Sequence, residues 1–162
     1  VLGIDGAVAL KSLSEFSGTW RRFEYKGKNK NNILIYDDYA HHPTEIRATL
    51  KGAKDYFKGR KIFCVFQPHL YSRTKLLIED FAKSFNDADF VVISDIYAAR
   101  EISDGSITSE ILAEKIKKNN KNVFYIKSFD EIVNFLSLTA RENDVIITMG
   151  AGDIFKVGEN ML

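Results

Sequence analysis

The sequence contains one cysteine, two prolines and ten glycines in 162 residues. A single cysteine cannot form an internal disulfide, which fits the reducing cytoplasm that we expect for this protein. No stretch approaches the roughly 20 apolar residues that a membrane-spanning helix needs, so a transmembrane span is excluded. The apolar start from Val1 to Leu10 carries Asp5 and lacks a basic lead-in, and is therefore a poor signal peptide.

An excess of charge of one sign is also lacking. The net charge is +1, from 23 basic and 22 acidic residues, and gives no indication of a nucleic-acid surface. No loop of the form Gly-x-x-x-x-Gly-Lys-Ser/Thr occurs, so this chain cannot cradle a triphosphate in that way. Hydrophobic residues make up 45% of the chain, which excludes intrinsic disorder and suits one folded domain.

From Ile33 onward, apolar runs typical of buried strands alternate with helical patterns. The expected strands are 33–36, 61–66, 90–93, 123–126 and 144–149, and the expected helices are 43–57, 72–85, 108–118 and 130–138, with a last short helix after 153. Continuous apolar strands that alternate with helices predict a doubly wound, mostly parallel α/β sheet of Rossmann-like type, with helices on both faces.

The first 32 residues follow a different pattern. Asp5 to Phe16 has apolar residues near helical spacing and predicts a short helix, which ends at Gly18. Thr19 to Tyr25 alternates aromatic and charged residues as a strand does, and the polar run from Lys26 to Asn32 predicts a turn.

Polar side chains gather directly after the predicted strands, where ligands bind in parallel sheets. The four clusters are 37–43, 67–74, 95–101 and 150–153, and they include all three histidines, both prolines, Arg73 and Arg100. Because the carboxyl ends of parallel strands share one edge, we expect the clusters to lie on a single rim.

Two of these clusters offer anionic or cationic groups. Asp37 and Asp38 could form a structural bond, either as a cap of the following helix or to a neighbouring loop amide. They could equally contact ribose hydroxyls or magnesium. The residues alone leave these two interpretations open. His69 and Arg73 flank the start of a predicted helix, where a guanidinium fork and the helix N-terminus favour a carboxylate or phosphate. A surface salt bridge is the alternative for Arg73.

Metal binding and dinucleotide binding find weaker support. His41 and His42 are adjacent, so their side chains diverge, and a zinc site would need further ligands from His69, Cys64 or the aspartates. Cys64 lies in the middle of a predicted strand and is expected in the core. The loop Gly150 to Asp153 resembles half of a dinucleotide fingerprint but lacks the third glycine, so a tight turn into the last helix is favoured.

Five motifs stand in the order and spacing of a known family. They are 21–24 (Arg-Arg-Phe-Glu), 37–45 (Asp-Asp-Tyr-Ala-His-His-Pro-Thr-Glu), 66–74 (Phe-Gln-Pro-His-Leu-Tyr-Ser-Arg-Thr), 97–101 (Tyr-Ala-Ala-Arg-Glu) and 149–154 (Met-Gly-Ala-Gly-Asp-Ile). Together they resemble the C-terminal domain of the Mur ligases, in the branch that adds L-alanine. The second and third motifs are highly specific.

The resemblance implies an ATP-dependent ligase of peptidoglycan precursor synthesis. In that family ATP, with Mg²⁺, phosphorylates the lactyl carboxylate of UDP-N-acetylmuramate, and the amino group of L-alanine then attacks the acyl phosphate. Residues 21–162 would form the C-terminal domain, and residues 1–20 would be the tail of the central ATP-binding domain. The N-terminal and central domains would be its partners, Mg²⁺ would be held mainly by the central domain, and the chain alone would be inactive.

The resemblance also implies roles for single residues. Arg22 matches the arginine that reaches the ATP phosphates, and one of Asp37 and Asp38 matches the acid that holds the ribose. The positions that face the acyl phosphate and the amino acid are Tyr39, His41, His69 and Arg73, of which His41 and Arg73, with Arg22, are the catalytic candidates. Leu70 stands where the family often has an arginine, so one possible anion contact is missing.

Three other functions compete with this one. A muropeptide-recycling ligase, which attaches a tripeptide to the same nucleotide sugar, shares the segment 37–43 but not the stretch 67–74. A stand-alone nucleotide-binding module would bind ATP without chemistry. A metal-dependent hydrolase would be built on the three histidines.

Overall fold

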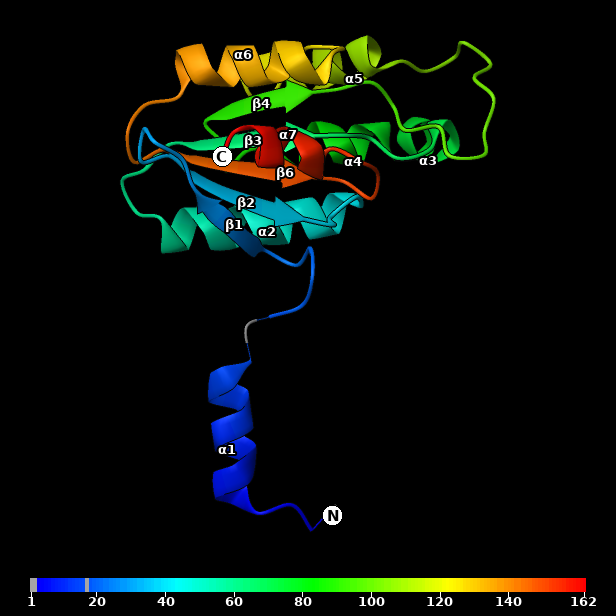
Figure 1. Ribbon diagram of the computed structural model, residues 1–162. Coiled ribbons are helices and arrows are strands. Elements are labelled where there is room, and N and C mark those ends of the chain that lie inside the picture. Colours follow the sequence, from blue (N-terminus) through cyan, green and yellow to red (C-terminus); the bar gives the residue numbers. More distant parts are fainter. Residues whose placement is uncertain (1–2, 17) are drawn as a thin grey trace.

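The computed structural model describes residues 3–16 and 18–162; Val1, Leu2 and Ser17 of the predicted tail lie outside the described residues. Within the described part, six strands form one sheet in the order β1-β2-β6-β3-β4-β5 (Figure 1). They are β1 (Glu24–Lys28), β2 (Leu34–Asp38), β3 (Ile62–Phe66), β4 (Phe90–Ile93), β5 (Val123–Tyr125) and β6 (Val145–Met149). Strands β2 to β6 run parallel, and β1 pairs antiparallel with β2 at one edge. The predicted fold class is confirmed.

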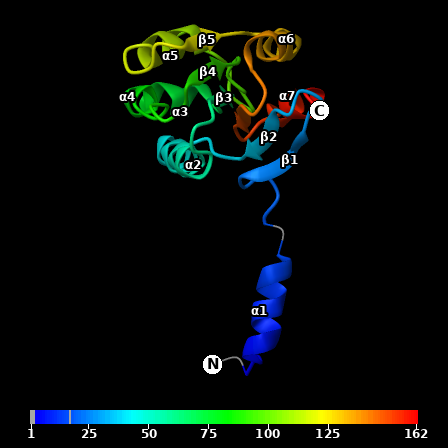
Figure 2. The same ribbon diagram turned by 90° about the vertical axis from the view of Figure 1, so that its left-hand side faces the viewer.

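Helices cover both faces of the sheet (Figure 2). The helices of the described part are α1 (Gly6–Glu15), α2 (Pro43–Tyr56), α3 (Tyr71–Leu76), α4 (Ile78–Ala82), α5 (Ser109–Ile116), α6 (Phe129–Thr139) and α7 (Phe155–Asn160), of which α1 does not cover the sheet. Buried side chains of α2, α4 and α5 pack on one face, and those of α6 and α7 pack on the other. No helix among the described residues is long and apolar enough to cross a membrane.

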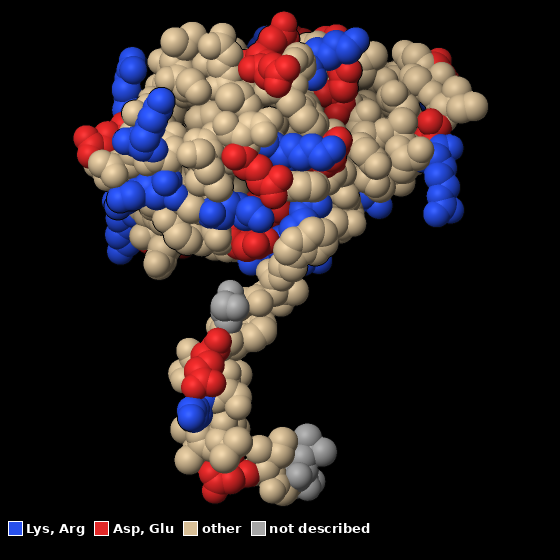
Figure 3. Space-filling view, in the orientation of Figure 1, with Lys and Arg blue, Asp and Glu red and all other residues tan. Residues whose placement is uncertain are grey.

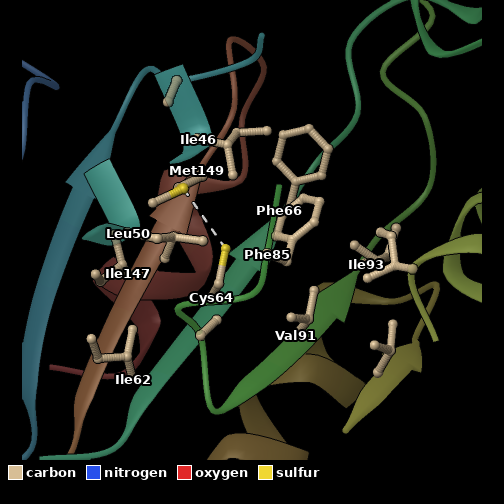
Figure 4. Close-up of a cluster of buried hydrophobic side chains, with 14 of the residues drawn as sticks. Ile46, Leu50, Ile62, Cys64, Phe66, Phe85, Val91, Ile93, Ile147 and Met149 are labelled. Carbon is tan, nitrogen blue, oxygen red and sulfur yellow. Dashed lines mark hydrogen bonds between the residues drawn. The ribbon is translucent and has the colours of Figure 1, made fainter. Parts of the chain in front are cut away.

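The core under α2, α4 and α5 consists of aliphatic and aromatic side chains from both layers (Figure 4). Cys64 lies in the middle of β3, where its Sγ contacts Met149 Sδ at 3.7 Å. Burial, with a smaller effect of Asp38, raises the pKa of the Cys64 thiol. The thiol therefore stays protonated, and the prediction that Cys64 belongs to the core is confirmed.

Two predicted elements are wrong in their bounds. The strand expected at 19–25 begins only at Glu24, because Arg21 and Phe23 have φ of 53° and 47° and cannot continue an extended strand. Pairing with β2 then extends to Lys28, inside the expected turn. The helix expected over 72–85 is broken, because Leu77 has a non-helical ψ of 18° between α3 and α4.

Arg21, which precedes β1, is buried. Its Nε donates to Asp37 Oδ2 at 2.6 Å, and its Nη2 and Nη1 donate to the carbonyl oxygens of Gly150 and Gly152 at 2.6 and 3.0 Å. Arg21 is 3% exposed and Asp37 is 1% exposed. The guanidinium carbon also lies 4.8 Å from the ring centroid of Phe155. This ion pair joins the segment before β1 to β2 and to the loop that follows β6.

The Asp38 carboxylate holds the backbone of the same segment. Asp38 Oδ2 accepts a hydrogen bond from Phe23 N at 2.8 Å, and Oδ1 accepts one from Ala40 N at 2.7 Å. Non-glycine residues rarely adopt the left-handed conformation of Arg21 and Phe23, so the segment depends on such bonds. Arg22 lies between these two fixed residues with its side chain 52% exposed.

Helix α1 stands apart from the sheet (Figures 1 and 2). Asp5 caps its first turn by accepting from Ala7 N and Val8 N, so the predicted short helix is confirmed. The helix has no buried residue, and Val8, Leu10 and Leu13 are exposed. Figure 3 shows a helix surface with few charges. Its stability depends on local bonds and not on packing against the sheet.

Two leucine substitutions test this difference. Leu136→Ala should lower the free energy of unfolding by about 2–5 kcal/mol, because it leaves a cavity in the core. Leu13→Ala should change it by less than about 0.5 kcal/mol, because surface substitutions have small effects. The two residues are 0% and 69% exposed. Urea unfolding of the isolated chain measures both values, and similar losses would show that α1 packs on the domain.

A second pair of variants tests the role of Arg21. Arg21→Ala leaves the Asp37 carboxylate buried without its cation and should lower the free energy of unfolding by about 3–5 kcal/mol. Arg22→Ala, its matched neighbour, should lower it by no more than about 0.5 kcal/mol. Thermal and guanidinium unfolding give the two values. Equal effects of the two substitutions would contradict the buried ion pair.

Candidate functional site

A row of rings lies along the rim at the carboxyl ends of the strands. The ring centroids are 5.4 Å apart for Tyr39 and His41, 5.9 Å for His41 and His69, and 5.7 Å for His69 and Tyr97. Tyr39 and His41 follow β2, and His69 follows β3 and forms a bridge with Tyr97 after β4. The structure therefore brings three of the predicted site residues together. Tyr97, the fourth ring, belongs to the motif 97–101 and is not among the predicted site residues.

Arg73 joins this row from the first turn of α3. Its Nη1 lies 3.4 Å from His69 Nδ1. Burial, followed by the charges of Arg73 and His41, lowers the pKa of His69, so His69 is neutral at neutral pH and can accept from Arg73. Glu101 fixes the start of α3, because its carboxylate accepts from both the backbone N–H and the hydroxyl of Ser72. His69 and Arg73 are thus held as a pair.

Arg22 lies at the other end of the rim. Its guanidinium carbon is 5.6 Å from the Tyr39 ring centroid, and its Nη1 is 3.9 Å from Glu45 Oε1. Glu45 is the third residue of α2 and forms a capping box with His42, the N-cap. His42 Nδ1 accepts from Thr44 N, so the His42 ring serves the helix. The adjacent histidines have separate contacts, as expected.

The two aspartates have internal partners. Asp37 Oδ2 binds Arg21 and Oδ1 accepts from the Thr148 hydroxyl at 2.6 Å. Both oxygens of Asp38 accept from backbone amides. Burial raises the pKa of Asp38, although the amides of Ala40 and Phe23 and the charge of Arg22 oppose it. The sequence left open whether these aspartates form structural bonds or contact ribose or magnesium. The structure shows that both form structural bonds.

The described residues contain no group of three or more His, Cys, Asp or Glu side chains placed to hold a metal ion. The histidine trio is not arranged as one set of ligands, because the His42 ring caps the start of α2 and does not join the row of His41 and His69. The geometry gives no support to a hydrolase centred on these histidines.

The glycine loop after β6 is filled by protein atoms. A side chain at Gly150, which has φ of 148°, would meet the Gln67 carbonyl oxygen, and one at Gly152 would meet the side chains of Gln67 and Tyr97. Gln67 Nε2 donates to Asp153 Oδ1 at 3.0 Å. The loop is a tight turn that leads into α7, as predicted, and its glycines allow close packing.

Sequence reasoning missed Arg21, Glu45 and Gln67. Arg21 and Arg22 are adjacent and identical in type, so only the buried Asp37 distinguishes them. Glu45 follows the N-cap by three residues, and this capping-box spacing is the one signal that sequence reasoning could have used. Arg100, on the predicted rim, is exposed in the loop after β4.

Known proteins resemble this chain in sequence and in fold. A family model described as Mur ligase, glutamate ligase domain, matches residues 21–152. UDP-N-acetylmuramate–L-alanine ligase from Caldanaerobacter subterraneus is 50% identical over 162 residues, which are all of this chain and 35% of that protein. The chain therefore spans about a third of the length of such relatives.

Two solved structures resemble the fold along its whole length. A UDP-N-acetylmuramate–alanine ligase from Thermotoga maritima has a TM-score of 0.79 and 33% identity, and the match covers 99% of this chain and 33% of that one. A murein peptide ligase from Psychrobacter arcticus has a TM-score of 0.70 and 25% identity, with 99% and 33% covered. From the family model, the sequence identity and the shared fold together, we conclude that this chain belongs to the Mur ligase family, as a C-terminal domain of the type found in UDP-N-acetylmuramate–L-alanine ligases.

Proposed function

We propose that this chain is the C-terminal domain of an ATP-dependent ligase that joins L-alanine to UDP-N-acetylmuramate in the cytoplasm. The observation that carries the proposal is a rim with exposed Arg22 at one end and the Arg73–His69 pair at the other, in a chain 50% identical to a relative of that name. Among the solved structures, the identity of 33% to an alanine ligase against 25% to the murein peptide ligase favours alanine over a tripeptide as the amino component.

The chemistry has two steps in this proposal. The lactyl carboxylate takes the γ-phosphoryl group of ATP to give an acyl phosphate and ADP. The amino group of L-alanine then attacks the acyl carbon, and the tetrahedral intermediate expels phosphate as the amide forms. Arg22 would hold the phosphate oxygens as negative charge shifts, because guanidinium donors aimed at such oxygens stabilise the transition state.

Tyr39, His41, His69 and Arg73 would serve the acyl-phosphate and amino-acid end. Arg73 is suited to the carboxylate of alanine, because its planar fork can form two charge-assisted hydrogen bonds. Neutral His69 would orient that fork through the 3.4 Å contact. Leu70 adds no charge to this turn, so Arg73 would be its one guanidinium.

The ribose contact is proposed for Asp38. Both aspartates have internal partners, but Asp37 is paired with the buried guanidinium of Arg21, whereas Asp38 accepts only from neutral backbone amides. Asp38 is also the last residue of β2 and the more exposed of the two, at 5% against 1%. Because both carboxylates already have internal partners, the described residues do not fit a magnesium site of their own. Mg²⁺ would be held mainly by the central domain upstream.

We place the domain boundary near Trp20. The family model starts at residue 21, and α1 packs no side chain on the sheet. Residues 1–20 would then be the tail of the central ATP-binding domain, whose surface would cover the exposed face of α1. The phosphate loop would lie in that domain, so the chain alone would be inactive.

The role of Arg22 is tested in the ligase that includes the upstream domains. Arg22→Ala should raise the activation free energy by roughly 3–4 kcal/mol and so lower kcat, because this is the contribution of one donor to a developing anion. Arg22→Lys should restore only part of it, because the planar fork is lost. Phosphate release measures both, with Arg47→Ala as a matched control on the exposed face of α2. Near-normal turnover of Arg22→Ala would show that Arg22 is only a surface charge.

The amino-acid end is tested by Arg73→Ala and His69→Ala. Each should raise the apparent KM for L-alanine more than the KM for ATP, because a carboxylate loses charge-assisted hydrogen bonds that water replaces poorly in a closed cleft. Steady-state kinetics with each substrate varied in turn give the two constants. Arg60→Ala is the control, since Arg60 binds the Asn143 carbonyl at the other end of the sheet. A change in the ATP dependence alone would place this turn at the nucleotide.

A further inference from the structure

Glu45 contacts two parts of the proposed site, Arg22 and the backbone of His41. Its Oε2 accepts hydrogen bonds from the backbone N–H groups of His41 and His42 at 3.0 and 3.1 Å. Its Oε1 faces Arg22 Nη1 at 3.9 Å. One carboxylate therefore touches the guanidinium proposed for the phosphates and the backbone that carries His41.

The position of this carboxylate is set by α2 and not by Arg22. Pro43 starts the helix, and the capping box with His42 orients the Glu45 side chain toward the helix start. Partial burial raises the pKa of Glu45, but the amide of His41, the His41 charge, the amide of His42 and Arg22 together lower it. The carboxylate is consequently ionised at neutral pH, and its two backbone hydrogen bonds hold it at the helix start.

Arg22 has few other restraints on its side chain. It is half exposed, and the Tyr39 ring lies near its guanidinium at 5.6 Å. The 3.9 Å separation from Glu45 is an ion-pair distance and too long for a hydrogen bond. The guanidinium N–H groups therefore remain available to an anion. An ion pair this exposed adds little to stability, so its effect is on orientation.

We propose that Glu45 is a positioning residue that holds Arg22 toward the rim before the triphosphate binds and links that placement to the backbone of His41. This inference rests on the proposed function, because it requires Arg22 to meet the phosphates. A donor held in its working orientation needs less reorganisation when charge develops. Loss of the Glu45 charge should therefore lower turnover, and only through Arg22.

Glu45→Gln in the ligase with its upstream domains separates the charge from the cap. Glutamine can still accept from the backbone at this position of a capping box, so the melting temperature should stay unchanged. We expect kcat to fall about fivefold, within the range measured for coupled neighbouring residues. Asp55→Asn is the matched control, because it removes the same charge from the far end of α2, where Asp55 pairs with Lys51, and should keep wild-type turnover.

The double variant Arg22→Ala/Glu45→Gln decides how Glu45 acts. If Glu45 acts through Arg22, the double variant turns over at the same rate as Arg22→Ala. A further fivefold loss in that background, or wild-type turnover of Glu45→Gln alone, would overturn the positioning role. Wild-type turnover of Arg22→Ala would instead overturn the proposed function, and the inference with it.

Discussion

The Arg21–Asp37 ion pair connects three segments that are far apart in the sequence. Removing both charges from water is costly, and such a pair persists only where the remaining donors and acceptors are satisfied. Here Arg21 also donates to two loop carbonyls, and Asp37 also accepts from Thr148. The pair fixes the entry into β1, the end of β2 and the turn after β6 in one arrangement, and the Arg22 end of the rim is built on these three points.

This arrangement gives adjacent arginines opposite roles. Arg21 is buried and serves the fold, while Arg22, one residue later, is held at the surface between backbone positions that Asp38 and the left-handed conformations determine. Strain of this kind is tolerated where the surrounding bonds over-determine the backbone. The hydrogen-bonded segment before β1 thus presents Arg22, and the carboxylate of Glu45 lies where it can restrain the guanidinium.

The sheet could be predicted because its strands are continuous apolar runs, such as β3, in which all five residues are buried. Polar clusters could be placed on one rim because parallel strands share their carboxyl edge. The start of β1 and the break at Leu77 could not be predicted, because both depend on local backbone conformations that only tertiary contacts select. The same limit applied to Arg21 and Asp37, whose side-chain partners lie 16 or more residues away in the sequence.

Asp37 binds Arg21 and Thr148, and we propose that it makes no contact with the ribose. In the ligase with its upstream domains, the ratio of kcat/KM for ATP to that for 2′-deoxy-ATP and 3′-deoxy-ATP reports contacts to the ribose hydroxyls. We predict that Asp37→Asn keeps the wild-type ratios for both analogues, even where its stability and turnover fall. Ratios that drop toward one in Asp37→Asn would show that Asp37 binds the ribose and would contradict this account.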